Sequence, residues 1–226
     1  TCAIIAIFFI LLVSNFIYFY VMSGLLGIWN NANQKFLHDY EDWYNNEHLF
    51  ERLSVSNINV ARRFQGLKSN YNYFTSYEAK TYKTFFSEEY LKKLNKPTKK
   101  TKFVMEFVFQ DMSRTVFKKT ILKGSIRGAF CLIISIRDKI EVENLINFQK
   151  NIKNINQVYS EIWESKEIKD FQISKEESLR GKDKKFSNCL YLEFTNGNDA
   201  VFLMDDAKSI FNEAEIGAYQ LISTLT

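Results

Sequence analysis

The sequence has few of the residues that build disulfides, metal centres and fixed turns. Its 226 residues include three cysteines, two histidines and one proline. Cys2, Cys131 and Cys189 show no paired spacing, which predicts reduced thiols and a reducing compartment. Because there are only two histidines and no Cys-x-x-Cys pair, we expect no metal site built by the protein.

The motifs of several enzyme classes are missing as well. The sequence contains no Gly-rich phosphate loop, no Gly-x-Ser-x-Gly elbow and no Asp-x-Asp pair. The net charge of +4 comes from 30 basic and 26 acidic residues, and the lysines are dispersed except in KKLNKPTKK, so nucleic acid is not an expected partner. An aromatic content of 16% suits a sheet-rich interior or an apolar cavity.

An uncharged run occupies residues 2–21 and is long enough to cross a bilayer. Two interpretations stay open. The run is a membrane anchor, which would place the protein at the inner membrane, or it is sequence from an extended start and the protein is cytoplasmic. The second interpretation rests on the missing initiator methionine and basic segment, and on Met22, which directly opens the following part. A membrane is an expected partner only if residues 2–21 are present in the mature protein.

The pattern of apolar residues after this run predicts strands and helices in a regular order. We expect strands at 24–30, 56–66 and 71–81, a helix between the first two that Asn31 or Asn33 caps, and a short helix that Ser87 caps. Residues 102–122 are ambiguous by periodicity, and we interpret them as a helix that runs into a fourth strand.

From about Gly124 the same order begins again. We expect strands at 127–136, 159–168, 189–195 and 217–225, with helices within 141–155 and 198–214. The charged residues 177–186 are interpreted as a solvated loop. Strand, helix, strand, strand, helix, strand is therefore written twice, which predicts an α+β fold of two ferredoxin-like repeats at 22–122 and 123–226.

Residues 42–53, DWYNNEHLFERL, gather more chemically useful side chains than any other stretch. In three pairs the two residues are four positions apart and would therefore lie on neighbouring turns of a helix. The pairs are Trp43 and Glu47, Tyr44 and His48, and His48 and Arg52. An imidazole among a phenol, carboxylates and a guanidinium can have its pKa moved across neutrality, as acid or base catalysis requires. A structural ion-pair network between the helix and the second strand is the competing interpretation.

Residues 42–64, DWYNNEHLFERLSVSNINVARRF, resemble the signature of the EthD-like branch of the dimeric α+β barrel superfamily, near DWYDTEHIPERLAVPGFLSARRY. The two differ where Phe50 replaces a proline and where Ser56 and Asn57 replace a Pro-Gly pair. The resemblance implies that the two repeats close into one intramolecular dimeric α+β barrel, as a monomer or homodimer. The second repeat has no counterpart of DWYNNEHLFERL, so one site is expected.

The resemblance also implies a function and a set of site residues. It implies an enzyme without a cofactor that acts on a hydrophobic or aromatic small molecule, as a monooxygenase, isomerase, dehydratase or decarboxylase. The implied catalytic residues are His48 as general base or acid, Tyr44 as hydrogen-bond donor, Glu47 or Glu51 as orienter of the ring, and Arg52 as anion stabiliser. The residues expected to bind the substrate are Trp43, Trp29, Tyr40 and Arg62.

Two alternatives stay open. The first is a non-catalytic barrel that sequesters a small apolar ligand or serves a structural role, with the aromatic residues as its binding surface. The second is haem chemistry, because some barrel relatives carry haem on a histidine, and the candidates here are His38 and His48.

Overall fold

The computed structural model describes residues 23–138, 141–168 and 173–226. Its centre is a closed antiparallel barrel with the strand order β1-β3-β2-β8-β5-β7-β6-β4. The strands are β1 (Gly24–Ala32), β2 (Ile58–Lys68), β3 (Tyr73–Ala79), β4 (Phe109–Lys123), β5 (Phe130–Ile136), β6 (Gln157–Ser165), β7 (Asn188–Phe194) and β8 (Glu215–Leu225). The predicted α+β class with a closed barrel is confirmed.

The two halves of the chain contribute equivalent parts of this barrel. The first half supplies the order β4-β1-β3-β2 and the second supplies β8-β5-β7-β6, which is the ferredoxin-like order in each case. The halves join where β2 pairs with β8 and where β4 pairs with β6. The predicted boundary between residues 122 and 123 falls at the end of β4, and it stays a prediction as a limit between domains.

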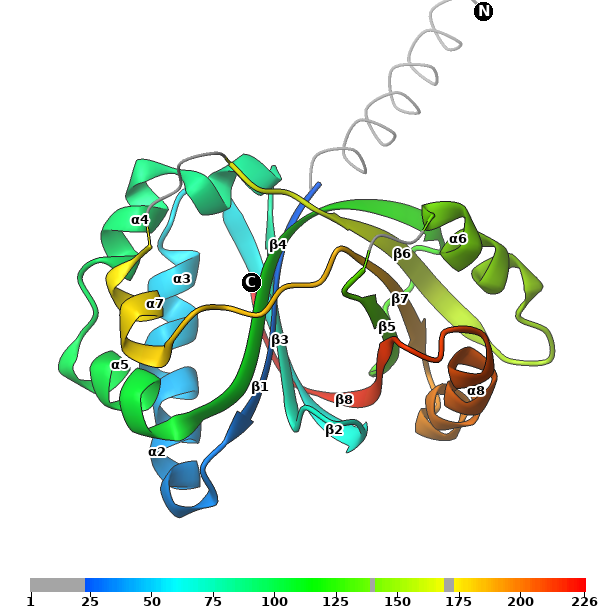
Figure 1. Cartoon of the computed structure of the whole chain (residues 1–226), viewed down its shortest axis with the longest axis horizontal. Helices are drawn as coiled ribbons and strands as arrows, with labels where there is room; N and C mark the ends of the chain where they lie inside the picture. Colours follow the sequence, from blue (N-terminus) through cyan, green and yellow to red (C-terminus); the bar gives the residue numbers. More distant parts are fainter. Residues whose placement is uncertain (1–22, 139–140, 169–172) are drawn as a thin grey trace, which may run out of the picture.

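Helices cover both sides of the barrel (Figure 1). Figure 1 shows α2, α3, α4, α5 and α7 on one side, and α6 and α8 on the other. Their bounds are α2 (Leu37–Trp43), α3 (Leu49–Leu53), α4 (Glu88–Leu94), α5 (Lys99–Phe103), α6 (Val142–Asn151), α7 (Lys175–Arg180) and α8 (Gly197–Ile210). The predicted cap is confirmed at Ser87, whose hydroxyl accepts a hydrogen bond from the Tyr90 amide.

One interpretation was wrong. Residues 177–186 are not a solvated loop throughout, because they include the last four residues of α7 and the buried side chains of Asp183 and Phe186, although Lys182, Lys184 and Lys185 are exposed. This segment belongs to the connection between β6 and β7, and α7 lies among the helices of the first half. Arg180 and Asp183 form a buried ion pair, whereas Lys182 and Lys184 are exposed, and charge patterning alone cannot distinguish the two kinds of charge.

The helix that carries the signature is continuous from α2 to α3 through a π-helical turn at Tyr44–His48. Its buried face presents Tyr40, Trp43, Tyr44, His48 and Arg52 to the sheet. A π-helical turn inserts one residue into the helix and is frequent at functional sites. The turn brings Tyr44 and His48 onto the same buried face as Trp43.

The barrel interior and the helix-covered face of the sheet hold separate cores. The interior core includes Trp29, Phe74 and Trp163, while the core under the first-half helices includes Tyr44 and Tyr77. Alternate residues of β3 therefore point to opposite faces, as the pleat requires. Cys131 and Cys189 are buried free thiols, which confirms the prediction that these two cysteines are not paired in a disulfide.

Residues 2–21, for which an anchor was weighed, lie outside the described residues. Within the part that the structure describes, no helix combines the length and the apolar character that a bilayer span requires.

Candidate functional site

His48 lies at the end of the π-helical turn and is 3% exposed. Its ring stacks on Trp43 with the centroids 3.9 Å apart, and the rings of Tyr44 and Tyr77 meet it edge-on at 5.4 and 6.2 Å. Three aromatic side chains, two from the helix and one from β3, thus enclose the imidazole.

The surroundings of His48 keep its ring neutral. Burial, together with the positive charges of Arg52, Arg180 and Arg63, holds the pKa of His48 well below its usual 6.5. Both effects act in the same direction, because burial disfavours the imidazolium and neighbouring cations repel it. A neutral imidazole at pH 7 can accept a proton, so the predicted role of general base is chemically open to it.

Glu51 and Glu47 lie in different places relative to this ring. Glu51 Oε2 is 3.8 Å from His48 Nδ1, and burial raises the pKa of Glu51 against the opposing charge of Arg52. Glu47 instead accepts hydrogen bonds from the hydroxyls of Thr98 at 2.6 Å and Thr101 at 3.1 Å. Of the two carboxylates, Glu51 is therefore the one that lies close to the imidazole.

Glu47 acts on the other ring of the stack. Thr101 Oγ1 receives a hydrogen bond from the indole nitrogen of Trp43 at 3.0 Å and donates to Glu47. This chain of hydrogen bonds fixes the indole on which His48 stacks.

Two arginines border the site, and each is tied to an acid. Arg52 forms a buried ion pair with Glu176 of α7. Arg63 of β2 is bound by both oxygens of Glu41 at 2.8 and 3.0 Å, and its guanidinium lies 4.1 Å from the centroid of the Tyr44 ring. The aromatic faces and the acids keep both guanidinium groups in fixed positions.

Unpartnered polar atoms gather around His48. Among the described residues, the buried side-chain atoms here that lack a hydrogen-bond partner are His48 Nδ1, Glu51 Oε2, Arg52 Nη1, Arg63 Nε and Tyr77 OH, whereas the hydroxyls of Tyr44 and Thr75 interact with each other. More than nine in ten buried polar groups in proteins are normally paired. A group of donors and acceptors left open in one place is what a site for a polar part of a ligand requires.

Two predicted substrate-binding residues are not at this place. Trp29 points into the barrel, where its ring lies 4.9 Å from those of Phe74 and Phe186. Arg62 also faces the interior, 3.3 Å from Glu78 and 3.5 Å from Glu193. The sheet separates both side chains from His48.

Tyr40 and Trp43 do lie beside His48, under the helix. Tyr40 packs against Tyr44 at 5.0 Å and exchanges hydrogen bonds with Asn30. The sequence reasoning missed Arg63, Thr75, Tyr77 and Glu176. The first three could have been proposed as candidates, because neighbouring residues of β2 and β3 must point to opposite faces of the sheet. The sequence pattern does not say which of the two faces the helix covers.

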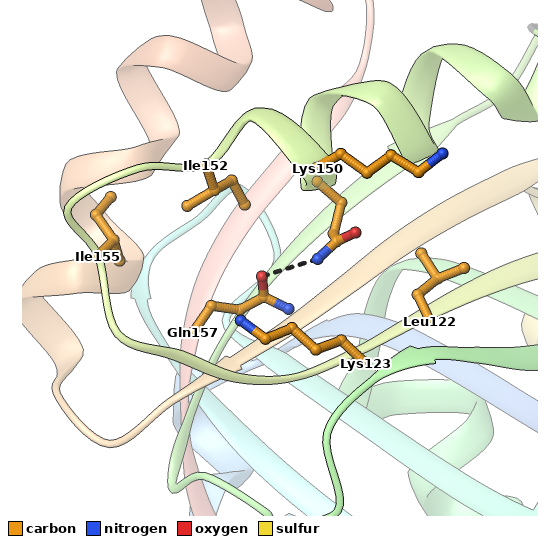
Figure 2. A pocket seen from close by; sticks show the side chains of 7 residues that line it. Leu122, Lys123, Lys150, Ile152, Ile155 and Gln157 are labelled. Carbon is orange, nitrogen blue, oxygen red and sulfur yellow. Dashed lines mark hydrogen bonds between the residues drawn. The ribbon is translucent and has the colours of Figure 1, made fainter.

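The second half offers a different kind of hollow (Figure 2). It lies between α6 and the ends of β4 and β6, has a volume of about 370 Å³, and is lined by Leu122, Lys123, Gln149, Lys150, Ile152, Ile155 and Gln157. Gln149 donates a hydrogen bond to the side chain of Gln157 at 3.2 Å. This lining contains neither an imidazole nor a carboxylate.

Comparisons with known proteins identify the fold. No family model matches the sequence, and no curated protein does. A solved structure described as an anthrone oxidase-like protein matches with a TM-score of 0.60 at 7% identity, over 91% of this chain and 93% of that chain. The chain therefore shares its α+β barrel fold with that structure.

Two further solved structures match this barrel less closely. A putative monooxygenase from Fusobacterium nucleatum has a TM-score of 0.47 and 10% identity, over 89% of this chain and 94% of that one. A chlorite dismutase from Candidatus Nitrospira defluvii has a TM-score of 0.47 and 13% identity, over 88% and 92%.

Haem does not fit the two histidines of this barrel. A haem-binding histidine presents a ring nitrogen to a slot wide enough for a porphyrin. His38 is exposed on α2, whereas His48 is enclosed by the rings of Trp43, Tyr44 and Tyr77. We therefore derive no haem chemistry for the site.

Proposed function

We propose that this barrel is a small EthD-like enzyme that needs no cofactor and uses His48 for acid-base chemistry on a hydrophobic or aromatic small molecule. The observation that carries the proposal is the group of unpartnered polar atoms around a neutral, buried imidazole. A helix-to-sheet contact with a purely structural role would pair these groups, because each buried group left open costs about 1–3 kcal/mol. The name of the anthrone oxidase-like structure fits an aromatic substrate.

The roles of the residues follow from their positions. His48 takes a proton from the substrate, and the electron pair left behind moves onto a substrate oxygen. The hydroxyls of Tyr44 and Tyr77 remain neutral donors for that oxygen, because burial raises the pKa of both. Arg52 and Arg63 stabilise the negative charge. We thus propose for Tyr44, Glu51 and Arg52 the roles that the resemblance implies, and we add Tyr77 and Arg63.

The barrel is closed by strands of one chain, which supports a monomer as the working state. The proposed partner is then a small molecule.

A substrate screen with matched histidine variants tests the proposal. Phenols, aromatic ketones and polyketide-like compounds are incubated with wild type, His48→Ala and His38→Ala. General acid-base catalysis contributes roughly 10²–10⁴-fold, so we expect turnover to fall by that factor in His48→Ala and to persist in His38→Ala. Unchanged turnover in His48→Ala would exclude His48 as the base.

A non-catalytic ligand-binding barrel is the second candidate, and the enclosure of His48 favours it. At 3% exposure the ring is reached only if the surrounding side chains move. This candidate predicts that an aromatic ligand binds to His48→Ala as well as to wild type, that binding depends on Trp43 and Tyr44, and that no product forms.

A further inference from the structure

The connection between β6 and β7 crosses from the second half of the chain to the first. Its described parts are residues 166–168 and 173–187. The Lys166 amide donates to the carbonyl of Val116 at 2.9 Å, and the Phe186 amide donates to the Thr115 hydroxyl at 3.0 Å. Between these attachments α7 packs against the helical turn Val104–Val108, on the side of the barrel that carries the first-half helices (Figure 1). The connection is thus fixed to β4, and α7 is held against the helices of the first half.

Two further contacts fix α7 at its start. The Ser174 hydroxyl accepts a hydrogen bond from the Glu177 amide at 3.2 Å, and the Lys175 amide donates to the side chain of Asn95, at the end of α4, at 2.9 Å. These contacts set the position of Glu176, which lies between them in the sequence.

Glu176 reaches the His48 site from this helix. Its side chain is 3% exposed and pairs with Arg52, which lies 124 residues earlier in the chain. The Arg52 guanidinium is also 5.6 Å from the centroid of the Tyr90 ring, and its Nη1 has no partner among the described residues. One side of the guanidinium is therefore taken by Glu176, while one nitrogen stays open.

Glu51 is a second carboxylate close to the same arginine. It directly precedes Arg52 in the helix, and its charge raises the pKa of Arg52. Its Oε2 nevertheless has no hydrogen-bond partner and lies 3.8 Å from His48 Nδ1. An isolated helix could satisfy Arg52 only with acids of the first half, such as Glu51. The acid from α7 removes that need and leaves Glu51 beside the imidazole.

We propose that Glu176 is a positioning residue of the His48 site. By holding Arg52, it reserves Glu51 for the imidazole, so the second half of the chain completes the site of the first. The inference rests on the proposed function, and it assigns a role to a segment that lies outside the signature.

Nuclear magnetic resonance of the full chain labelled with ¹⁵N-histidine tests this role without a substrate. The chain has two histidines, and the His38→Ala variant assigns their signals. A carboxylate beside Nδ1 favours the tautomer with the proton on that nitrogen. In Glu176→Gln, we expect Arg52 to turn to Glu51, so that the His48 tautomer shifts away from the Nδ1-protonated form.

The controls separate positioning from structure. Glu177→Gln removes a charge from the neighbouring position of α7 and should leave the His48 signals unchanged. Glu51→Gln should shift them as Glu176→Gln does, and the double variant should show no additional shift. Unchanged His48 signals in a folded Glu176→Gln protein, or shifts that add in the double variant, would overturn the proposal.

A milder variant serves if Glu176→Gln does not fold. Glu176→Asp keeps the charge and withdraws the carboxylate by one methylene group, so an intermediate shift supports the proposal and an unchanged spectrum overturns it. Because the spectra need no substrate, this role can fail while His48 proves catalytic, or hold while His48→Ala keeps full turnover.

Discussion

The depressed pKa of His48 makes a prediction about stability and pH. The folded ring resists protonation, whereas the same imidazole in the unfolded chain has a pKa of about 6.5. Below that pH the unfolded state binds more protons than the folded state, so the stability contributed by the neutral ring is lost as the pH falls. If the folded ring stays neutral, about 1.4 kcal/mol is lost by pH 5.5, because each pKa unit corresponds to about 1.36 kcal/mol.

Denaturant unfolding of wild type and His48→Gln between pH 8 and pH 5.5 measures this contribution. Burial raises the pKa of Glu51, Glu78 and Glu193, which makes their contribution run in the opposite direction. For that reason the difference between the two proteins is the quantity to follow, with His38→Gln as the exposed control. We expect wild type to lose about 1.4 kcal/mol more than His48→Gln over this range. Parallel curves would refute the claim that His48 is buried in its neutral form.

Three other predictions separate function from packing. Tyr77→Phe removes a buried hydroxyl that has no partner, so the unfolding free energy should rise by about 1–3 kcal/mol while turnover falls; a stability loss with normal turnover would contradict this. Trp43→Ala should cost about 3–5 kcal/mol in denaturant unfolding, because the indole is fully buried, whereas Phe107→Ala, at a 55% exposed position, should cost little. Arg52→Met leaves Glu176 buried and unpaired and should cost about 3–5 kcal/mol, and Arg52→Met combined with Glu176→Met should recover part of that loss; additive costs would show that the pair is not coupled.

Local patterns in the sequence predict most of the fold. The apolar run before Asn30, the Ser87 cap and the return of the same order after Gly124 place the strands and helices near their observed positions. The two ferredoxin-like repeats follow from that order. Each of these signals depends on residues close together in the chain, which is why they can be read without coordinates.

The arrangement of the site is only partly accessible in this way. Trp29 stands in a strand that is apolar on both faces, so nothing in the sequence tells the barrel side from the helix side. Arg62 and Arg63 are adjacent in β2, so their side chains point to opposite faces of the sheet. The sequence does not say which of the two faces the signature helix. The pairing of Glu176 with Arg52 spans 124 residues and depends on the path of the connection between β6 and β7. The charges of that segment suit a solvated loop equally well.

The most direct test of the central claim is the pH profile of turnover on the first aromatic substrate found, for wild type and His48→Gln between pH 6 and pH 9. We expect the wild-type kcat to be nearly constant over this range, because the imidazole is already neutral, and His48→Gln to be about 10²-fold slower or worse throughout. Equal rates for the two proteins would contradict the claim, and the ligand-binding interpretation would then replace the catalytic one.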